Sequence, residues 1–414
     1  LPETFRVARE VFGQNQANIG AGAIDVTNAD GANEIASRMQ HYLATINYRA
    51  SDTLSFVALG GYLKSSKFSI ADCDHTPLPI CNFSNRARSR HWMAEGRGLY
   101  DSGSFRFTFG ANYLKHRIRT TSATPLFFSP AITPFVTSYY GQSFRDVQKL
   151  SSYAFFGQAE YDLSDQITLI GGIRYTHDNK TLDSIDAVSL SIPLSTALPR
   201  SIGAFEDFGA LVFADPNASL TTLNRQANGD LARFNKGLVN ANAQINFKPN
   251  DDLLLYLGYR RGVKSGGFIT GNVAGTLPAL RPFGEETNNA YEAGFKSTFM
   301  GGDVRLNGAV FYYDYQDMQN TSLIGITNVI TNNDAKVYGG ELELTARPVE
   351  GLNVFLATGY VHTKVQDIFN PTGAVPLLSD NRLPLAPRFT GNVRVRYDWD
   401  MLGGTMFVQG AARY

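Results

Sequence analysis

The sequence has few cysteines and tryptophans and no long hydrophobic run. Among 414 residues there are 2 cysteines and 2 tryptophans, whereas tyrosine occurs 20 times and phenylalanine 28 times. No apolar stretch approaches the roughly 18 residues that a helix needs to cross a bilayer. If the chain crosses a membrane, it must do so with strands, because in lipid only helices and closed barrels satisfy every backbone hydrogen bond.

The sequence also has no excess of charge of either sign. Lysine and arginine together number 37, and aspartate and glutamate together number 37. A balanced chain has no general electrostatic attraction for nucleic acid or for an anionic surface. We therefore expect no nucleic-acid partner.

Signals of catalysis are missing as well. The 6 histidines are scattered along the chain, and no G-x-S-x-G element is present. A nucleophile, a base and an orienting carboxylate cannot be assembled from these residues into a triad. We expect no enzymatic activity, no catalytic residue, no cofactor and no resident metal.

The sequence does contain a recurring alternation of polar and apolar residues. Residues 239–247 read VNANAQINF, and similar runs occur at 105–113, 303–313, 341–347 and 393–399. Successive side chains of a strand point to opposite faces, so each run makes one apolar face and one polar face. Charged residues in the middle of such strands need a hydrated interior, which favours a barrel with an apolar outer band and a polar lumen.

About 14 such runs can be counted. They are centred near residues 46, 60, 95, 111, 158, 172, 243, 260, 293, 310, 340, 360, 395 and 410. Most reach the roughly 9 to 11 residues that a tilted strand needs to cross a bilayer. We expect short helices only at 29–42 and within 180–235.

The connections between these runs alternate in length. Tight turns near residues 50, 101, 249, 300 and 402 alternate with connections at roughly 67–89, 118–151, 180–235, 269–285, 319–327 and 369–388. Short turns at one end and long loops at the other are typical of an outer-membrane barrel.

Aromatic residues lie toward the ends of the predicted strands, on their apolar face. They are Tyr153, Tyr161, Tyr175, Tyr312, Tyr397 and Trp399. This placement predicts aromatic girdles at the two membrane interfaces. The alternative is that tyrosine is simply common in β-proteins.

Both cysteines lie in one predicted loop. Cys73 and Cys81 bound the segment CDHTPLPIC. A local disulfide between them fits an oxidising envelope or surface location. A metal site that uses the thiols with His75, Asp72 and Asp74 is the alternative, but the spacing matches no standard site.

The two ends of the sequence suggest a longer protein. The chain opens LPETFRVARE, without the basic and apolar regions of a signal peptide, and stops at MFVQGAARY inside a predicted strand. We expect the chain to be a fragment or a processed piece.

Four motifs occur in order over about 95 residues. They are YRRGVKSGGF (259–268), FGEETNNAYEAGFKS (283–297), VFYYDYQDMQ (310–319) and KVYGGELELTARPVEGL (336–352). Their order and spacing closely resemble the barrel of TonB-dependent outer-membrane receptors. The matching residues are Tyr291, Glu292, Gly294 and Lys296, then Tyr313, Asp314, Tyr315 and Gln319, then Gly340, Glu341, Leu342 and Glu343. One departure is Gly284, where the family often has proline ahead of Glu285 and Glu286.

The resemblance implies an all-β fold, a transmembrane antiparallel β-barrel. Family members have 22 strands around an N-terminal plug, so residues 1–414 correspond to a partial barrel domain of about 14 strands, incomplete at both ends and without the plug. The motif residues Tyr291, Glu292, Gly294, Lys296, Gly340, Glu341 and Glu343 are expected in the barrel wall.

The resemblance also implies a function. Receptors of this kind reside in the outer membrane of Gram-negative bacteria, surrounded by its lipid, and import a scarce large solute, most often a ferric siderophore. Their energy comes from the TonB inner-membrane complex, which acts through the missing N-terminal region.

Loop residues are candidate contacts for an extracellular ligand. Aromatic rings and guanidinium groups suit acidic, planar chelates. The candidates are Tyr139, Tyr140, Arg145, Arg281 and Phe283. A passive diffusion porin is the alternative function, since porins share the alternation and the loops.

Overall fold

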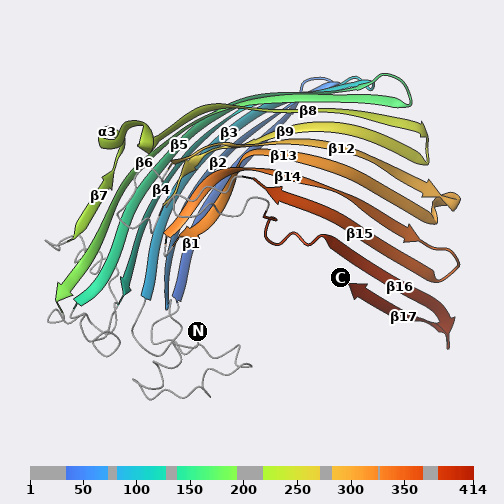
Figure 1. The fold of residues 1–414 in the computed structure, drawn as a ribbon. Helices are drawn as coiled ribbons and strands as arrows, with labels where there is room; N and C mark the ends of the chain where they lie inside the picture. The colour runs from blue at the N-terminus through green and yellow to red at the C-terminus, as the bar shows by residue number, and fades with distance from the viewer. Residues whose placement is uncertain are drawn as a thin grey trace, which may run out of the picture.

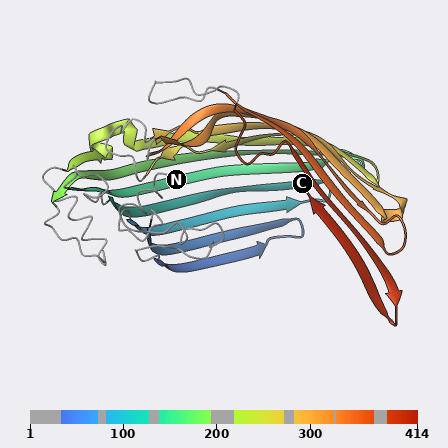
Figure 2. The same ribbon diagram turned by 60° about the horizontal axis from the view of Figure 1, so that its bottom comes forward.

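The protein forms a large curved antiparallel sheet. The computed structural model describes residues 34–72, 82–126, 138–193, 218–270, 282–324, 327–366 and 381–414. One sheet of 15 strands follows the order of the chain and bends into an open arc (Figures 1 and 2). Its edges are the first and last strands, so the sheet does not close on itself.

The strands of the large sheet are long. They are β1 (Glu34–Arg49), β2 (Leu54–Asp72), β3 (Asn82–Asp101), β4 (Phe105–Leu126), β5 (Ser138–Asp162), β6 (Ile167–Pro193), β7 (Ser219–Leu223), β8 (Arg233–Asn250), β9 (Leu253–Lys264), β12 (Glu286–Phe299), β13 (Val304–Ile324), β14 (Thr327–Ala346), β15 (Leu352–Val365), β16 (Phe389–Met401) and β17 (Gly404–Arg413). The short strand β7 pairs only with β6, beside the main path.

The remaining elements are small. A separate two-stranded sheet joins β10 (Gly267–Phe268) and β11 (Pro282–Phe283). The helix α3 (Arg225–Asn228) and the 3-10 turns η2 (Gly229–Ala232) and η4 (Met300–Gly302) complete the described elements. None of the described helices is long and apolar enough to span a membrane.

The predicted strands are confirmed. Each of the 14 predicted centres falls inside a strand of the main path. Short turns at 50–53, 102–104, 163–166, 251–252, 300–303, 347–351 and 402–403 join strands at one end, which we call the turn end and which lies on the right in Figure 1. The other connections leave from the opposite end, which we call the loop end. They are longer than these turns except between β13 and β14, where the expected long connection at 319–327 is wrong, because the two strands leave only residues 325–326 between them.

The turns rely on backbone conformations that favour glycine. Gly103 has φ 86° and Gly403 has φ 77°, both in the left-handed region. Side chains with a Cβ rarely adopt this region, so glycine allows the chain to reverse within a few residues.

Two details of the prediction are wrong. Residues 34–42 of the expected helix 29–42 lie in β1, and residues 29–33 lie outside the described residues. Pairing of β1 with β2 along its whole length outweighs the local helical propensity. The strands are also longer than expected, with 25 residues in β5 and 27 in β6, because several expected loops continue the strand pairing.

The second expected helical segment contains α3. Asn224 caps this helix by accepting a hydrogen bond at Oδ1 from the backbone N–H of Ala227, at 2.6 Å. An asparagine at this position satisfies an N–H group that the first turn leaves without an intrahelical partner.

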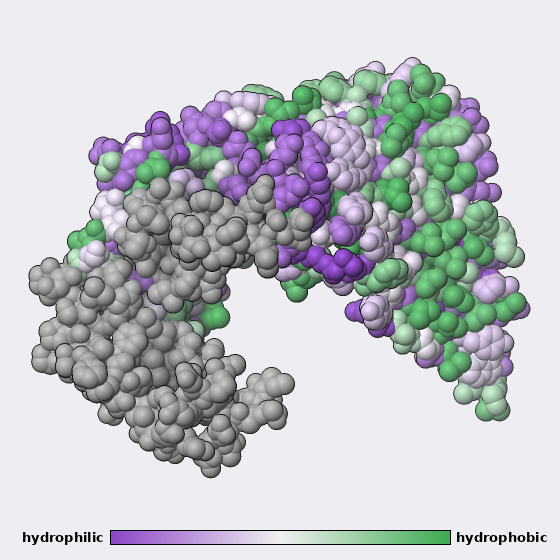
Figure 3. Space-filling view, in the orientation of Figure 1, coloured by the Kyte–Doolittle hydropathy of each residue, from purple (hydrophilic) through white to green (hydrophobic). Residues whose placement is uncertain are grey.

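The two faces of the sheet differ as the alternation predicts. On the convex outer face, Val239, Ile245 and Leu257 have exposed fractions of 40%, 41% and 59%. On the concave face, Gln244 Nε2 donates to Asn246 Oδ1 at 2.8 Å. Figure 3 shows apolar surface gathered over the strands toward the turn end. A large exposed apolar face of this kind requires lipid as its solvent.

Aromatic residues form rows on the outer face. Strand register places Tyr259, Tyr291, Tyr312, Tyr338 and His362 side by side on five adjacent strands. In the first strands, the rings of Tyr42 and Tyr62 have centroids 6.3 Å apart, and those of Tyr62 and Trp92 are 4.3 Å apart. We call these rows, with Tyr113, Tyr153 and Tyr175, the loop-end girdle.

A second set of aromatic residues lies at the turn end. Phe105 and Tyr161 have ring centroids 6.4 Å apart, and Tyr397 and Trp399 are 5.8 Å apart. The six predicted aromatic positions thus divide between the two ends of the sheet, as expected of interfacial girdles.

The apolar outer face makes a prediction for charge placement. Leu342, near the middle of the outer face of β14, should tolerate arginine poorly, because a cation at the bilayer midplane costs about 2 to 4 kcal/mol. Asn307→Arg is the matched control, since Asn307 pairs with Glu343 on the polar face. Urea unfolding of the intact protein from lipid vesicles should show the loss for Leu342→Arg alone. Equal losses for both variants would contradict the assignment of the faces.

Candidate functional site

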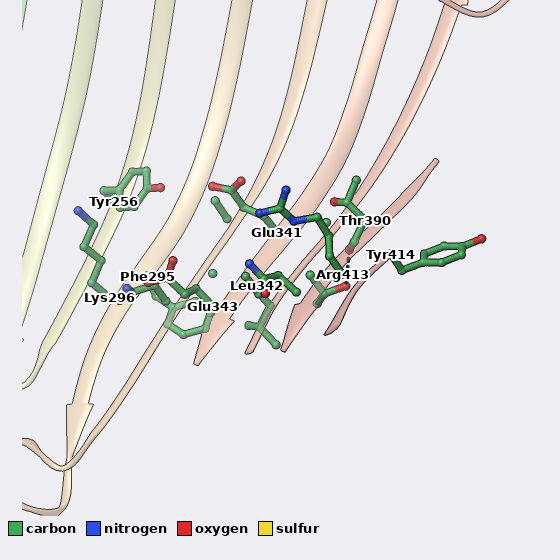
Figure 4. A pocket seen from close by; sticks show the side chains of 17 residues that line it. Tyr256, Phe295, Lys296, Glu341, Leu342, Glu343, Thr390, Arg413 and Tyr414 are labelled. Atoms are coloured by element: carbon green, nitrogen blue, oxygen red, sulfur yellow. Dashed lines mark hydrogen bonds between the residues drawn. The ribbon is translucent and has the colours of Figure 1, made fainter. Parts of the chain in front are cut away.

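The concave face carries a ladder of charged and polar side chains. Glu341 and Glu343 of β14 lie on the same face as Lys296 of β12, with Asn307 of β13 between them in register. These side chains and Tyr256 line an open hollow of about 530 Å³. Figure 4 shows Tyr256, Lys296, Glu341 and Glu343 around it. The family-motif residues with charge therefore face the space that the sheet encloses.

Glu292 belongs to the same ladder. Its Oε2 lies 3.8 Å from Nη1 of Arg260 on the neighbouring strand. The Arg260 side chain is 55% exposed, so water reaches the ion pair. An exposed ion pair of this kind contributes little to the free energy of unfolding. Tyr291, by contrast, points outward and is 49% exposed in the loop-end girdle.

Close packing explains the motif glycine Gly294. A Cβ there would lie 2.5 Å from the hydroxyl of Tyr256 and 2.7 Å from the carbonyl oxygen of Gly308. Only glycine at position 294 therefore leaves space for the Tyr256 side chain on the neighbouring strand. Gly340 is less constrained, since a Cβ there would lie 3.2 Å from the carbonyl oxygen of Ala309.

A hydrogen-bonded junction at the loop end connects three of the four motifs. Gln319 Nε2 donates to the carbonyl oxygens of Ser265 at 3.1 Å and Gly284 at 3.0 Å. The backbone N–H of Gln319 donates to Glu286 Oε2 at 2.8 Å. One residue of the third motif thus holds both ends of the segment that includes β10 and β11.

Asn332 completes this junction from β14, where it is the register partner of Gln319. Its Oδ1 accepts from the backbone N–H of Gly284 at 2.8 Å, and its Nδ2 donates to the carbonyl oxygen of Asp317 at 2.7 Å. Proline has no N–H and could not make the first bond. The departure from the family pattern at Gly284 therefore matches a hydrogen bond that only a non-proline residue can donate. We call Ser265, Gly284, Glu286, Gln319 and Asn332 the loop junction.

An apolar cluster lies beside the loop junction. Its buried members are Leu182, Leu223, Ala232, Phe234 and Phe268. They come from β6, β7, η2, β8 and β10, so the excursion between β6 and β8 packs back onto the concave face at the loop end. This packing gives the loop end a folded inner wall.

Lys180 lies at the border of this cluster. Its Nζ donates to the carbonyl oxygen of Gly266 at 2.6 Å and lies 5.3 Å from the ring centroid of Phe234. Burial lowers the pKa of Lys180, while Asp178, with Oδ2 at 3.8 Å, acts in the opposite direction. The lysine therefore links β6 to Gly266, near the end of the first motif.

The turn end of the concave face has a separate ionic cluster. Arg106 donates from Nη1 to Asp162 Oδ2 and from Nη2 to Glu160 Oε1, each at 2.8 Å. Thr168 Oγ1 also donates to Asp162, at 2.8 Å. The cluster ties β4, β5 and β6 together, and only their register reveals it.

The predicted ligand contacts are not gathered in one place by the described residues. Phe283 is half-buried, pairs with Gly267 and packs against the cluster of Ile269 and Val329. Arg145 is exposed on the outer face of β5, opposite to the concave face. The structure therefore separates Arg145 from Phe283.

Two other predicted ligand contacts, Tyr139 and Tyr140, lie at the start of β5. The backbone of Tyr139 pairs with β6, and that of Tyr140 pairs with β4. Arg281, Cys73 and Cys81 lie outside the described residues. These assignments stay predictions.

The loop junction predicts that Gln319 holds the loop segment. Gln319→Ala should lower the free energy of local opening of residues 265–270 and 282–284 by about 1 to 3 kcal/mol, because the carbonyl oxygen of Ser265 loses its donor and that of Gly284 keeps only Asn332 Nδ2, at 3.2 Å. Hydrogen exchange of the intact protein would measure this. Gln316→Ala is the control on the same strand, since Gln316 is exposed and lies outside the junction. Unchanged exchange in Gln319→Ala would contradict the role.

Comparison with known proteins tests the family. The family model described as TonB dependent receptor-like, beta-barrel matches residues 5–414. The fold is similar to that of the ferric yersiniabactin uptake receptor FyuA from Yersinia pestis, with 18% identity, a TM-score of 0.66, and coverage of 92% of this chain and 49% of that chain.

Two further solved structures share the fold. The siderophore receptor PiuA from Acinetobacter baumannii has 15% identity and a TM-score of 0.56, over 87% of this chain and 52% of that chain. The copper transporter OprC has 14% identity and a TM-score of 0.57, over 88% of this chain and 50% of that chain. The chain spans about half the length of the structures it matches.

The family match confirms the interpretation of the four sequence motifs. It covers nearly the whole chain, and the family consists of transporters, not enzymes. The chain belongs to the TonB-dependent receptors of the Gram-negative outer membrane and carries their β-barrel.

Proposed function

We propose that the receptor containing this chain imports a ferric siderophore across the outer membrane, with energy from the TonB system. Membership of the family supports a ligand and a need for TonB. Two of the solved structures named above are described as receptors for siderophores or their iron complexes, and the third as a copper transporter. These descriptions support a siderophore or a metal as the substrate class.

The observation that carries the proposal is a set of accessible cations on the concave face near the loop end. Lys236 lies 3.4 Å from Glu285, and Lys264 lies 3.9 Å from Glu286. The lysine side chains are 55% and 63% exposed. Such exposed ion pairs contribute little free energy, so a ligand's carboxylate or catecholate oxygens can replace the protein carboxylates.

Phenol rings lie on the same face as these cations. Tyr315 and Tyr313 of β13 lie two and four residues toward the turn end from the register level of Lys264, and Tyr256 of β9 lies eight residues from Lys264. Aromatic faces and cations together suit a planar acidic chelate. The loop candidates Tyr139, Tyr140, Arg281 and Phe283 remain proposed contacts.

Uptake by cells tests the proposal. A strain that lacks the receptor should recover transport of a radiolabelled ferric siderophore when the intact receptor is expressed, and it should lose transport again when TonB is deleted. Transport that continues without TonB would favour a passive porin. TonB-dependent uptake of a copper chelate but of no ferric siderophore would contradict the iron assignment.

A matched pair of lysines on β8 tests the site. Lys236→Ala should weaken binding of the transported chelate about tenfold, equivalent to about 1.4 kcal/mol, because a charge-assisted contact is lost. Lys248→Ala is the control, since Lys248 lies at the turn end of the same strand beside Asp251. Binding titrations of the two variants of the intact receptor would measure the difference. Equal affinities for both variants would exclude Lys236 from the ligand site.

A further inference from the structure

Two histidines that are distant in sequence lie side by side on the concave face. His91 of β3 is the register partner of His116 of β4, and their ring centroids are 5.6 Å apart. His116 shares its face of β4 with Arg106 of the turn-end ionic cluster. Trp92, the residue after His91, points outward in the loop-end girdle, so the two histidines lie at the girdle level on the inner side of the wall. We call His91 and His116 the histidine pair.

The histidine pair is accessible and has few protein partners. Both residues are half-buried, and their neighbours in the same row are the apolar residues Leu63 of β2 and Leu150 of β5. Among the described residues, neither ring has a carboxylate oxygen within 4.0 Å, and the ring of His91 makes no hydrogen bond. The ring nitrogens of His91 are therefore available to a ligand from the hydrated space inside the curve.

Ser89 contacts the other member of the pair. Its Oγ lies 3.2 Å from Nε2 of His116 and on the same face of β3 as His91. When Nε2 carries the proton of the neutral ring, it donates to this hydroxyl, and the lone pair is on Nδ1. Histidines that bind a metal almost always donate their other ring N–H to such an acceptor. Ser89 thus favours the tautomer of His116 that can bind a metal through Nδ1.

The separation of the two rings suits a single ion between them. Transition metals bind imidazole nitrogen at about 2.0 to 2.1 Å, so two rings on one tetrahedral ion have centroids about 5 to 6 Å apart. The observed 5.6 Å lies in this range. An ion can therefore be bound by both rings without a change in the register of β3 and β4.

The ligand type restricts the ion. Imidazole suits divalent ions such as Cu²⁺, Ni²⁺ and Zn²⁺, whereas Mg²⁺ and Ca²⁺ prefer carboxylate, carbonyl and water oxygens. No group of three or more histidine, cysteine, aspartate or glutamate side chains that could hold a metal occurs among the described residues. Two protein ligands leave at least two positions of a four-coordinate ion open to water or to a solute.

We propose that the histidine pair binds a divalent transition ion such as Cu²⁺ or Zn²⁺, with one nitrogen from each ring. Ser89 acts as a positioning residue, because it contacts His116 and not the ion. The sequence analysis expected no resident metal on the ground that the histidines are scattered, but strand register brings two of them together. The site does not depend on the proposed import of a ferric siderophore, since the groups that carry that proposal are Lys236 and Lys264.

Copper titration of the intact receptor tests the histidine pair, with Cu²⁺ alone as the probe. Electron paramagnetic resonance should show a bound Cu²⁺ with two equatorial nitrogens, because Cu²⁺ forms the most stable complexes in the divalent series. His91→Ala, His116→Ala and the double variant should each lower the affinity for this ion by at least about tenfold. Each single variant should lose about as much affinity as the double variant, because the two rings bind one ion together.

The matched control removes two histidines from the outer face. His177 and His362 each stack on one tyrosine, Tyr153 and Tyr338 respectively, with ring centroids 5.1 Å and 4.8 Å apart. The double variant His177→Ala and His362→Ala should bind Cu²⁺ at the histidine pair as the unmodified receptor does. Equal losses in the two double variants, or a signal from only one nitrogen, would overturn the proposal.

Two further measurements do not require the alanine variants of the pair to fold. Ser89→Ala keeps both rings and should weaken Cu²⁺ binding about tenfold, and Ser89→Thr should restore it. In the unmodified receptor, Cu²⁺ should protect His91 and His116 together from modification by diethyl pyrocarbonate, which mass spectrometry of peptides would detect. Absence of protection at both histidines would overturn the proposal, whatever the result of siderophore uptake. Unchanged binding in Ser89→Ala would overturn the role of Ser89.

Discussion

The wall of this protein must satisfy two solvents at once, and the rest of the structure follows from that constraint. Each strand exposes one set of side chains to lipid and the next set to the hydrated space inside the curve. Apolar residues such as Leu257 and Leu342 suit the first solvent, and Gln244, Glu341 and Glu343 suit the second. Backbone hydrogen bonds between strands leave few polar groups for the lipid to accommodate. Little buried core is needed, because the membrane takes its place.

The ends of the strands carry the specific chemistry. At the loop end, Gln319 and Asn332 gather motif residues that are distant in sequence into one junction. The adjacent excursion between β6 and β8 packs an apolar cluster onto the inner wall. At the level of the loop-end girdle, His91 and His116 lie side by side on the inner side of the wall. The same period-two pattern therefore places the solute-facing groups inside and the lipid-facing aromatic rings outside.

Strand positions and faces could be predicted because each strand repeats one simple pattern many times. Period-two alternation located every strand of the main path, and the aromatic residues indicated both girdles. Residues 34–42 were mistaken for helix because the partner strand, and not local propensity, determines their conformation. The role of Asn332 could not be predicted, since it depends on β14 lying beside β13. The proximity of His91 and His116 likewise could not be predicted, because it depends on the register of β3 and β4.

The assignment of the two faces can be measured most directly by spin labels placed one at a time at residues 341 to 344 of β14 in the intact receptor in lipid vesicles. Oxygen dissolves in lipid, whereas a charged nickel chelate stays in water, and each changes the relaxation of a label that it can reach. The two-solvent account predicts high oxygen accessibility at 342 and 344 and high nickel accessibility at 341 and 343. Accessibility that does not alternate, with one solvent reaching all four positions, would contradict it.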